Sequence, residues 1–306
     1  MTPVVWISGI TLVMLIALVA VTVGVVVTLT RRTRRPGDAR EPLTAASAAR
    51  THARRIHIAA WCALVLAMVT MTAVASSARG LEAGRITGLV LAAGGLTFLA
   101  VSALGEITWP RPTGSVRTAT LVRRTVRDVT PRPAAVLLGV TSALLLAALV
   151  AGGLTALPDG RSYGRTTMAA DGVAVTWASS PYPGWFYAVP LALAAAVILL
   201  ACGGCLLLIA RRPAITDTAS TWDLAMRQLS AQRVLRGATL SLGATAAPVY
   251  GLLALPFLRE GPWGIAVLLL LGALASIGVA AAAVALPGTV VPAAPEQARR
   301  TGWAVA

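Results

Sequence analysis

The sequence predicts an all-α fold: a polytopic transmembrane helix bundle of seven spans, with the N-terminus outside and the C-terminus inside. Two observations lead to this prediction. Seven long apolar runs contain no Asp, Glu, Lys, Arg or His, and arginine-rich loops alternate with arginine-poor ones. About 20 apolar residues suffice to cross roughly 30 Å of hydrocarbon as a helix. Because lipid offers no partners to the backbone, such runs are expected to be helical.

The predicted spans form a single membrane domain over residues 1–306. In chain order they are residues 4–30, 58–75, 86–104, 134–157, 185–210, 238–258 and 263–286. The mean hydropathy of +0.78 agrees with lipid as the surrounding medium. Trp6, Trp185 and Trp263 fall at predicted outer span ends and Trp61 at an inner one, which is the interfacial position that Trp prefers.

The orientation follows from the distribution of arginine. Loops 31–57, 105–133 and 211–237 and the tail from residue 287 together hold 21 of the 26 basic residues. Basic residues close to a span stay in the cytoplasm, so these loops are predicted to lie inside. The multi-pass chain is therefore expected in the bacterial inner membrane.

The first run is predicted to be a retained anchor rather than a cleaved signal. Residues 1–3 carry no charged side chain, the apolar run is longer than a signal core of about 7–15 residues, and Arg31-Arg32-Thr33-Arg34-Arg35 follows it. A basic stretch in that position is expected to stop transfer and fix the N-terminus outside.

The sixth span is predicted to be the most polar and most easily bent helix. Pro248 and Pro256 each remove a helical hydrogen bond. Ser241, Thr245, Pro248 and Tyr250 are the candidate cavity-lining residues. The alternative is a bent helix that its neighbours bury completely.

Two loops carry further structure. In the outer loop 158–184, Val173 to Trp177 alternate like a strand after Asp171-Gly172, which indicates a hairpin. Such a loop is expected to be a passive lid at the interface or a cap that binds a partner. In the inner segment 211–237, residues 220–236 form an amphipathic pattern with Trp222, Ala225, Met226 and Leu229 on one stripe. We expect this helix to lie on the membrane surface, with docking of a partner as the alternative.

No cofactor or metal is predicted. The absence of lysine excludes a retinal Schiff base, and His52 and His57 are interpreted as solvated loop residues. Cys202 and Cys205 lie at i and i+3 near the inner end of their span, and Cys62 lies near the inner end of another. A thiol cluster is a geometric possibility, but no nearby His, Asp or Glu completes a four-ligand site, so packing is the expected role.

The net charge of +15 is explained by topology rather than by nucleic-acid binding, because the arginines are spread over several loops. The expected partners are the lipid bilayer and anionic headgroups, with another membrane protein as a candidate. Arg123, Arg124 and Arg127 are predicted to reach headgroup phosphates.

Two short stretches resemble known proteins. They read Gly105-Glu106-Ile107-Thr108-Trp109-Pro110-Arg111-Pro112, followed by the arginine-rich segment 120–128, and Tyr182-Pro183-Gly184-Trp185-Phe186-Tyr187. Here the chain is similar to a family of uncharacterised polytopic integral membrane proteins of high-GC actinobacteria. The resemblance implies a membrane protein and assigns no activity, so no residue gains a role from it.

Three functions remain in order of expectation. A non-catalytic accessory or scaffold component of a membrane complex comes first, because the spans lack buried charge. A permease for a neutral or amphiphilic substrate, without coupling through a buried carboxylate, is the alternative. An enzyme is third, with Glu106, Asp128, Asp159 and Asp171 as the available acids and no nucleophile–base pair or phosphate loop in the sequence.

Overall fold

The computed structural model describes residues 45–110, 124–168, 174–214 and 220–291 of the chain. Its long helices are α2 (Ala45–Ser77), α3 (Leu81–Ile107), α5 (Arg132–Thr155), α6 (Trp185–Arg211), α7 (Ser220–Glu260) and α8 (Trp263–Ala285), with a short helix α4 (Val126–Val129) and a hairpin of β1 (Tyr163–Met168) and β2 (Ala174–Ser179). Six of these helices are long and apolar enough to cross a membrane. They coincide with the second to seventh predicted spans, whereas predicted span 4–30 lies outside the described residues.

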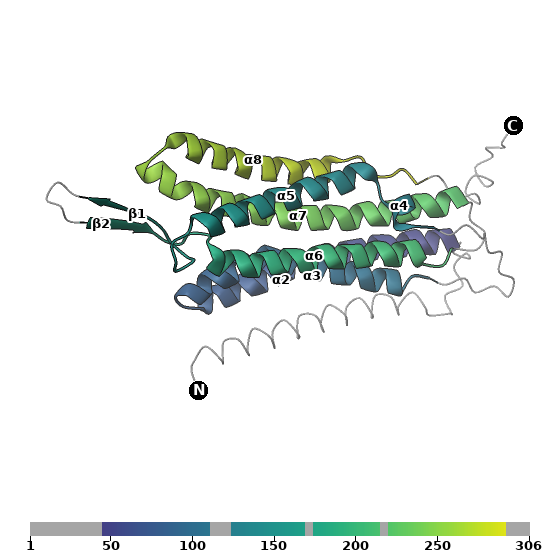
Figure 1. The fold of residues 1–306 in the computed structure, drawn as a ribbon. Helices are drawn as coiled ribbons and strands as arrows, with labels where there is room; N and C mark the ends of the chain where they lie inside the picture. The colour runs from purple at the N-terminus through teal and green to yellow at the C-terminus, as the bar shows by residue number, and fades with distance from the viewer. Residues whose placement is uncertain (1–44, 111–123, 169–173, 215–219, 292–306) are drawn as a thin grey trace.

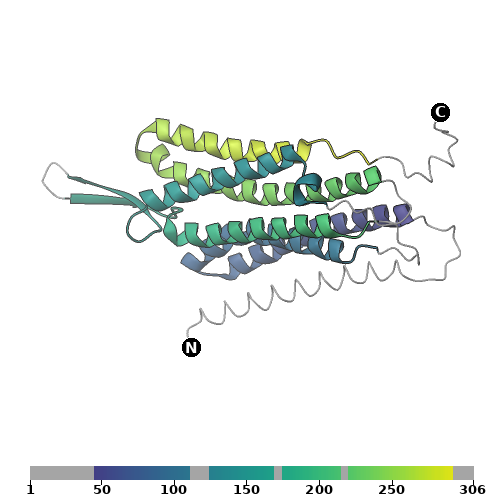
Figure 2. The same ribbon diagram turned by 45° about the vertical axis from the view of Figure 1, so that its right-hand side comes forward.

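The six long helices run up and down along a common direction (Figures 1 and 2). Helix α7 occupies the middle of the bundle and packs against α3, α5, α6 and α8, whereas α2 packs mainly against α3. At one end, α2, α5 and α7 begin and α3, α6 and α8 end. We call this the arginine-rich end, because the described residues of the predicted inner loops gather there. The hairpin projects from the opposite end.

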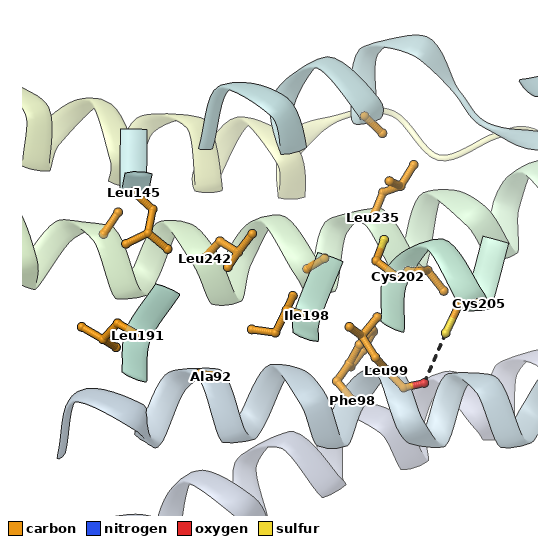
Figure 3. Packing of buried hydrophobic residues seen from close by; sticks show 14 of the residues in the cluster. Ala92, Phe98, Leu99, Leu145, Leu191, Ile198, Cys202, Cys205, Leu235 and Leu242 are labelled. Carbon is orange, nitrogen blue, oxygen red and sulfur yellow. Dashed lines mark hydrogen bonds between the residues drawn. The ribbon is translucent and has the colours of Figure 1, made fainter. Parts of the chain in front are cut away.

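The core lies where α3, α5, α6 and α7 meet, as Figure 3 shows for Phe98, Leu99, Leu145, Ile198 and Leu242. Leucine and isoleucine of different helices fill the space between the ribbons, so the spans are held by close packing, which drives helix association in lipid.

Glycine allows the closest approaches between helices. A Cβ added to Gly95 of α3 would lie 2.2 Å from the Oγ of Ser241 in α7, and one added to Gly237 would lie 2.2 Å from the ring of Phe98. The small residues of the third and sixth spans therefore set the distance between α3 and α7.

Two predicted boundaries are wrong at the arginine-rich end. Helix α2 already begins at Ala45, so the described part of predicted inner loop 31–57 is helical. Residues 220–236 are helical as predicted, but they do not form a separate helix on the membrane surface: α7 runs without interruption for 41 residues. The reason is that Trp222 and Met226 are buried against Ala46, Ala49 and Trp109 rather than free to face lipid.

The predicted hairpin is confirmed. β1 and β2 pair antiparallel from Tyr163 opposite Ser179 to Met168 opposite Ala174. The base of the hairpin is fixed by Leu157 N–H, which donates to Ser162 O at 2.8 Å, and by Tyr182 N–H, which donates to Arg161 O at 2.9 Å. The strands extend away from the helix ends in both views (Figures 1 and 2), and the role of this loop as a lid or a cap stays a prediction.

Candidate functional site

The most polar buried region of the described chain is a group of five charged residues at the arginine-rich end, which we call the ionic cluster: Glu106, Arg124, Arg212, Asp223 and Arg227. Each member comes from the end of a helix or from a connection beside one. The bundle brings them together between α3, α6 and the first turns of α7.

Asp223 lies in the first turn of α7, where the positive end of the helix dipole favours a carboxylate. Its side chain is only 2% exposed. The Oδ2 atom accepts a hydrogen bond from Nε of Arg227, one turn later, at 2.9 Å, and a second one from Nη1 of Arg124. One buried carboxylate thus binds two guanidinium groups from different segments of the chain.

Arg227 also closes the end of α6. Its Nη1 donates to the carbonyls of Ile209 at 2.7 Å and Ala210 at 3.0 Å, and its Nη2 donates to the carbonyl of Arg212 at 2.7 Å. The last carbonyls of a helix have no partner within the helix, and in an apolar environment each unsatisfied group is costly. Arg227 therefore caps α6 from α7 and fixes the two helices to each other.

Arg212 follows the last residue of α6 and forms the second buried pair. Its Nη1 lies 3.0 Å from Oε2 of Glu106, at side-chain exposures of 1% and 9%, and 3.4 Å from Oγ of Ser230. The guanidinium stacks on the ring of Trp109 at 3.8 Å. Burial lowers the pKa of Arg212 to about 10, and the charge of Glu106 opposes that shift. Arg212 therefore stays charged at neutral pH, and Glu106 supplies the opposite charge that compensates its burial.

The cluster holds three arginines and two carboxylates, so it has an excess of one positive charge. Nε and Nη2 of Arg212, Nε1 of Trp109 and Oδ1 of Asp223 are buried and have no hydrogen-bond partner. Three donor atoms and one carboxylate oxygen are thus left without a partner in and beside the cluster. This arrangement suits a fixed structural joint, because removal of either carboxylate would leave a buried charge without compensation.

A small polar cavity of about 30 Å³ lies beside the cluster, lined among others by His52, Glu106, Trp109, Ser230 and Arg233. Its volume fits about one water molecule. The Nε2 atom of His52 lies 3.0 Å from the carbonyl of Gly105, and the ring meets Trp109 edge-on. His52 is buried, so its interpretation as a solvated loop residue is wrong: the residue belongs to α2 and packs against the end of α3.

His57 is likewise part of α2 and is half-buried. Trp61 Nε1–H donates to its Nε2 atom at 3.3 Å. The two histidines are thus helix residues in contact with tryptophan rather than loop residues in solvent.

The three arginines predicted to contact headgroups, Arg123, Arg124 and Arg127, differ in their positions. Arg124 pairs with the buried Asp223 and is 16% exposed, and its contact with lipid phosphates stays a prediction. Arg127 lies on the short helix α4 and is exposed, which leaves it free to reach a headgroup. Arg123 lies outside the described residues.

The four predicted cavity-lining residues have separate surroundings. Ser241 Oγ donates to the carbonyl of Leu91 in α3 at 2.8 Å, and Thr245 Oγ1 donates within α7. Tyr250 donates to the carbonyl of Leu144 in α5 at 3.0 Å, and Pro248 is exposed on the bundle surface. Three of the four are buried in helix contacts, as in the packing alternative.

The cysteines are also separated. Cys202 and Cys205 are buried in the core, with Cys205 Sγ 3.5 Å from the carbonyl of Leu99 (Figure 3), whereas Cys62 is exposed on α2. Within the described residues, no group of three or more His, Cys, Asp or Glu side chains could hold a metal ion.

The acids considered for catalysis do not meet. Asp128 accepts hydrogen bonds from Thr125 N–H and Oγ1, which lower its pKa, and it serves the cap of α4. Asp159 lies at the hairpin end, where bonds from Ser162 and Arg161 lower its pKa. Glu106 belongs to the ionic cluster, and Asp171 lies outside the described residues.

One half of the cluster left a signal in the sequence, since Asp223 and Arg227 have the i, i+4 spacing of a helical ion pair. The other half did not. Glu106 and Arg212 are far apart in the chain and meet only because the ends of α3 and α6 lie together.

Comparison of the chain with protein-family models, curated proteins and solved structures finds no match.

Proposed function

We propose that this chain is a non-catalytic scaffold or accessory component of a complex in the bacterial inner membrane, with the arginine-rich end in the cytoplasm. The observation that carries the proposal is that the buried polar groups bond neighbouring helices to each other. The ionic cluster joins helices, and the hydroxyl groups of Ser241 and Tyr250 donate to carbonyls of neighbouring helices. These groups hold the bundle rather than offering a site for chemistry.

The hairpin is the element that a partner could reach most easily. It extends beyond the helix ends on a base that Gly160 and Ser162 help to fix, so its two strands present their outer edges. Unpaired strand edges are ready to pair with another chain. A rigid bundle with a projecting hairpin is a suitable platform for a partner on the outer side.

The test is co-purification from the native host in mild detergent, with quantification of each partner by mass spectrometry. The full chain should bring down a partner in a fixed ratio. A variant in which Gly164 to Ala178 is replaced by a short Gly-Ser linker keeps the base of the hairpin, including the packing of Tyr163 on Tyr182 and Phe257, and should lose that partner. Recovery of a stable monomer with no partner would contradict the proposal.

The permease hypothesis makes a different prediction. A cavity beside α7 would make flux sensitive to Pro248→Ala and Tyr250→Ala at unchanged expression. Pro248 is the sharper probe, because Tyr250 is bonded to α5 and loss of its ring would disturb packing. Unchanged flux in Pro248→Ala would remove this alternative.

A further inference from the structure

The exposed side of α2 carries a shallow apolar groove, and Met68 at its edge lies against Gly94 of α3. The groove has a volume of about 490 Å³ and is lined by Val65, Met68, Val69, Thr72, Ala73 and Ser76. Val65 and Val69 are 55% and 61% exposed. With Cys62, these exposed residues continue towards the arginine-rich end at alternating spacings of three and four, which is the spacing of a helix-packing seam.

The composition of this groove differs from that of a surface that faces only lipid. Around its middle, α8 exposes the bulky side chains of Leu268, Leu271 and Leu274, and smaller residues such as Ala275 and Gly278 are exposed beside them. The groove on α2 is lined instead by two Val, one Met, one Thr, one Ala and one Ser, with no leucine among them. Small side chains and hydroxyl groups are enriched where transmembrane helices approach each other closely.

We infer that the groove is the docking site of the chain's own first predicted span, residues 4–30, which packs antiparallel to α2. That span is uncharged throughout and leads into α2 through the 14 residues 31–44. A linker of this length reaches at most about 50 Å, so the span stays close to α2 at a high effective concentration. No other described helix packs extensively on the outward face of α2.

The first span offers a matching seam. Val13, Ala17, Ala20, Gly24 and Val27 recur at spacings of three and four, with small residues in the middle. Ala20 and Gly24 form a small-xxx-small pair, the pattern that lets two helices approach closely. Two neighbouring segments of one chain thus each carry a row of small or medium-sized side chains at spacings of three and four residues.

The register follows from the predicted inner limits of the two spans. Thr30 and Ile58 should lie at the same depth, so Gly24 to Val26 should lie opposite the residues around Cys62. Cys62 is exposed, whereas Cys202 and Cys205 are buried. The native chain therefore already holds one half of a cross-link.

The experiment places single cysteines at positions 24, 25, 26 and 27 and oxidises the full-length protein in native membranes with copper phenanthroline. Trypsin then cleaves at the arginines between residues 30 and 56, and mass spectrometry without reduction detects linked peptides. We expect an intramolecular disulfide with Cys62 at one or two of the four positions, at least fivefold above the others. Cys62→Ala is the control that abolishes it.

Three results would overturn the inference. Chain dimers linked through Cys62 would show that a second copy occupies the groove. Absence of any cross-link would leave the groove to lipid, and equal cross-linking at all four positions would indicate chance encounters. As a second measure, Val69→Trp should lower the best cross-link severalfold, whereas Val267→Trp on exposed α8 should not; equal yields in both would count against docking. None of these outcomes depends on an external partner, so the proposed scaffold function is tested separately.

Discussion

The substitution Asp223→Asn tests whether the ionic cluster holds the arginine-rich end together. It keeps the shape of the side chain and removes its charge. Arg227 would keep its three bonds to the carbonyls of α6, but its buried guanidinium would lose its carboxylate. Arg124 would lose its partner as well, although it is 16% exposed and can turn towards water.

The magnitude follows mainly from Arg227. An uncompensated buried charge costs about 3–5 kcal/mol, and the lower end applies because the carbonyl bonds remain. At about 2–4 °C per kcal/mol, the midpoint of thermal unfolding should fall by roughly 6–12 °C. Glu82→Gln is the matched control, since the Glu82–Arg85 pair lies at the surface and such pairs contribute about 0–1 kcal/mol.

The chain supplies its own probe for the assay. Cys202 and Cys205 are buried in the core and become accessible on unfolding. A dye that fluoresces on reaction with thiols therefore reports the transition in detergent, in a Cys62→Ala background that removes the exposed thiol. A midpoint for Asp223→Asn within 2 °C of the control would refute the structural role of the cluster.

Three further predictions use the same background. Gly95→Ala should destabilise the bundle by about 1–3 kcal/mol because its Cβ would overlap Ser241, whereas Gly203→Ala, with open space around it, should be neutral or slightly stabilising; equal midpoints would contradict the close approach of α3 and α7. Tyr250→Phe should cost about 0.5–1.5 kcal/mol through the lost bond to α5, and no change would show that this bond is dispensable. Met168→Cys should react with a membrane-impermeant maleimide in intact cells if the hairpin is outside, and labelling only after permeabilisation would reverse the predicted orientation.

The sequence was most informative where the bilayer imposes a single requirement. Helices α3, α5, α6 and α8 begin and end within five residues of the predicted spans, because a span cannot include charge and a loop can. The same rule misplaced the starts of α2 and α7. Both helices extend beyond their apolar runs at the N-terminal end. Charged residues in these extensions, such as Asp223 and Arg227, do not indicate whether the helix continues into the span.

The ionic cluster could be predicted only in part. The spacing of Asp223 and Arg227 is local and visible in the sequence. The pairing of Glu106 with Arg212 depends on which helices become neighbours, and the uniform apolar spans carry little information about that choice. The stacking of Arg212 on Trp109 follows from the same neighbourhood and has no local signal.

Three of the arginines predicted to set the topology therefore have a further role in the fold. Arg124, Arg212 and Arg227 lie in loops or helix ends predicted to be retained in the cytoplasm, and all three are partly or fully buried in ion pairs. A charge that only set topology could be Lys or Arg, but Arg227 binds a carboxylate and three carbonyls at once, which requires the planar fork of a guanidinium. Arg227→Lys should therefore keep the orientation and lose much of the stability. Maleimide accessibility and thermal unfolding measured on this one variant separate the two roles: unchanged stability would mean that Arg227 acts only as a positive charge.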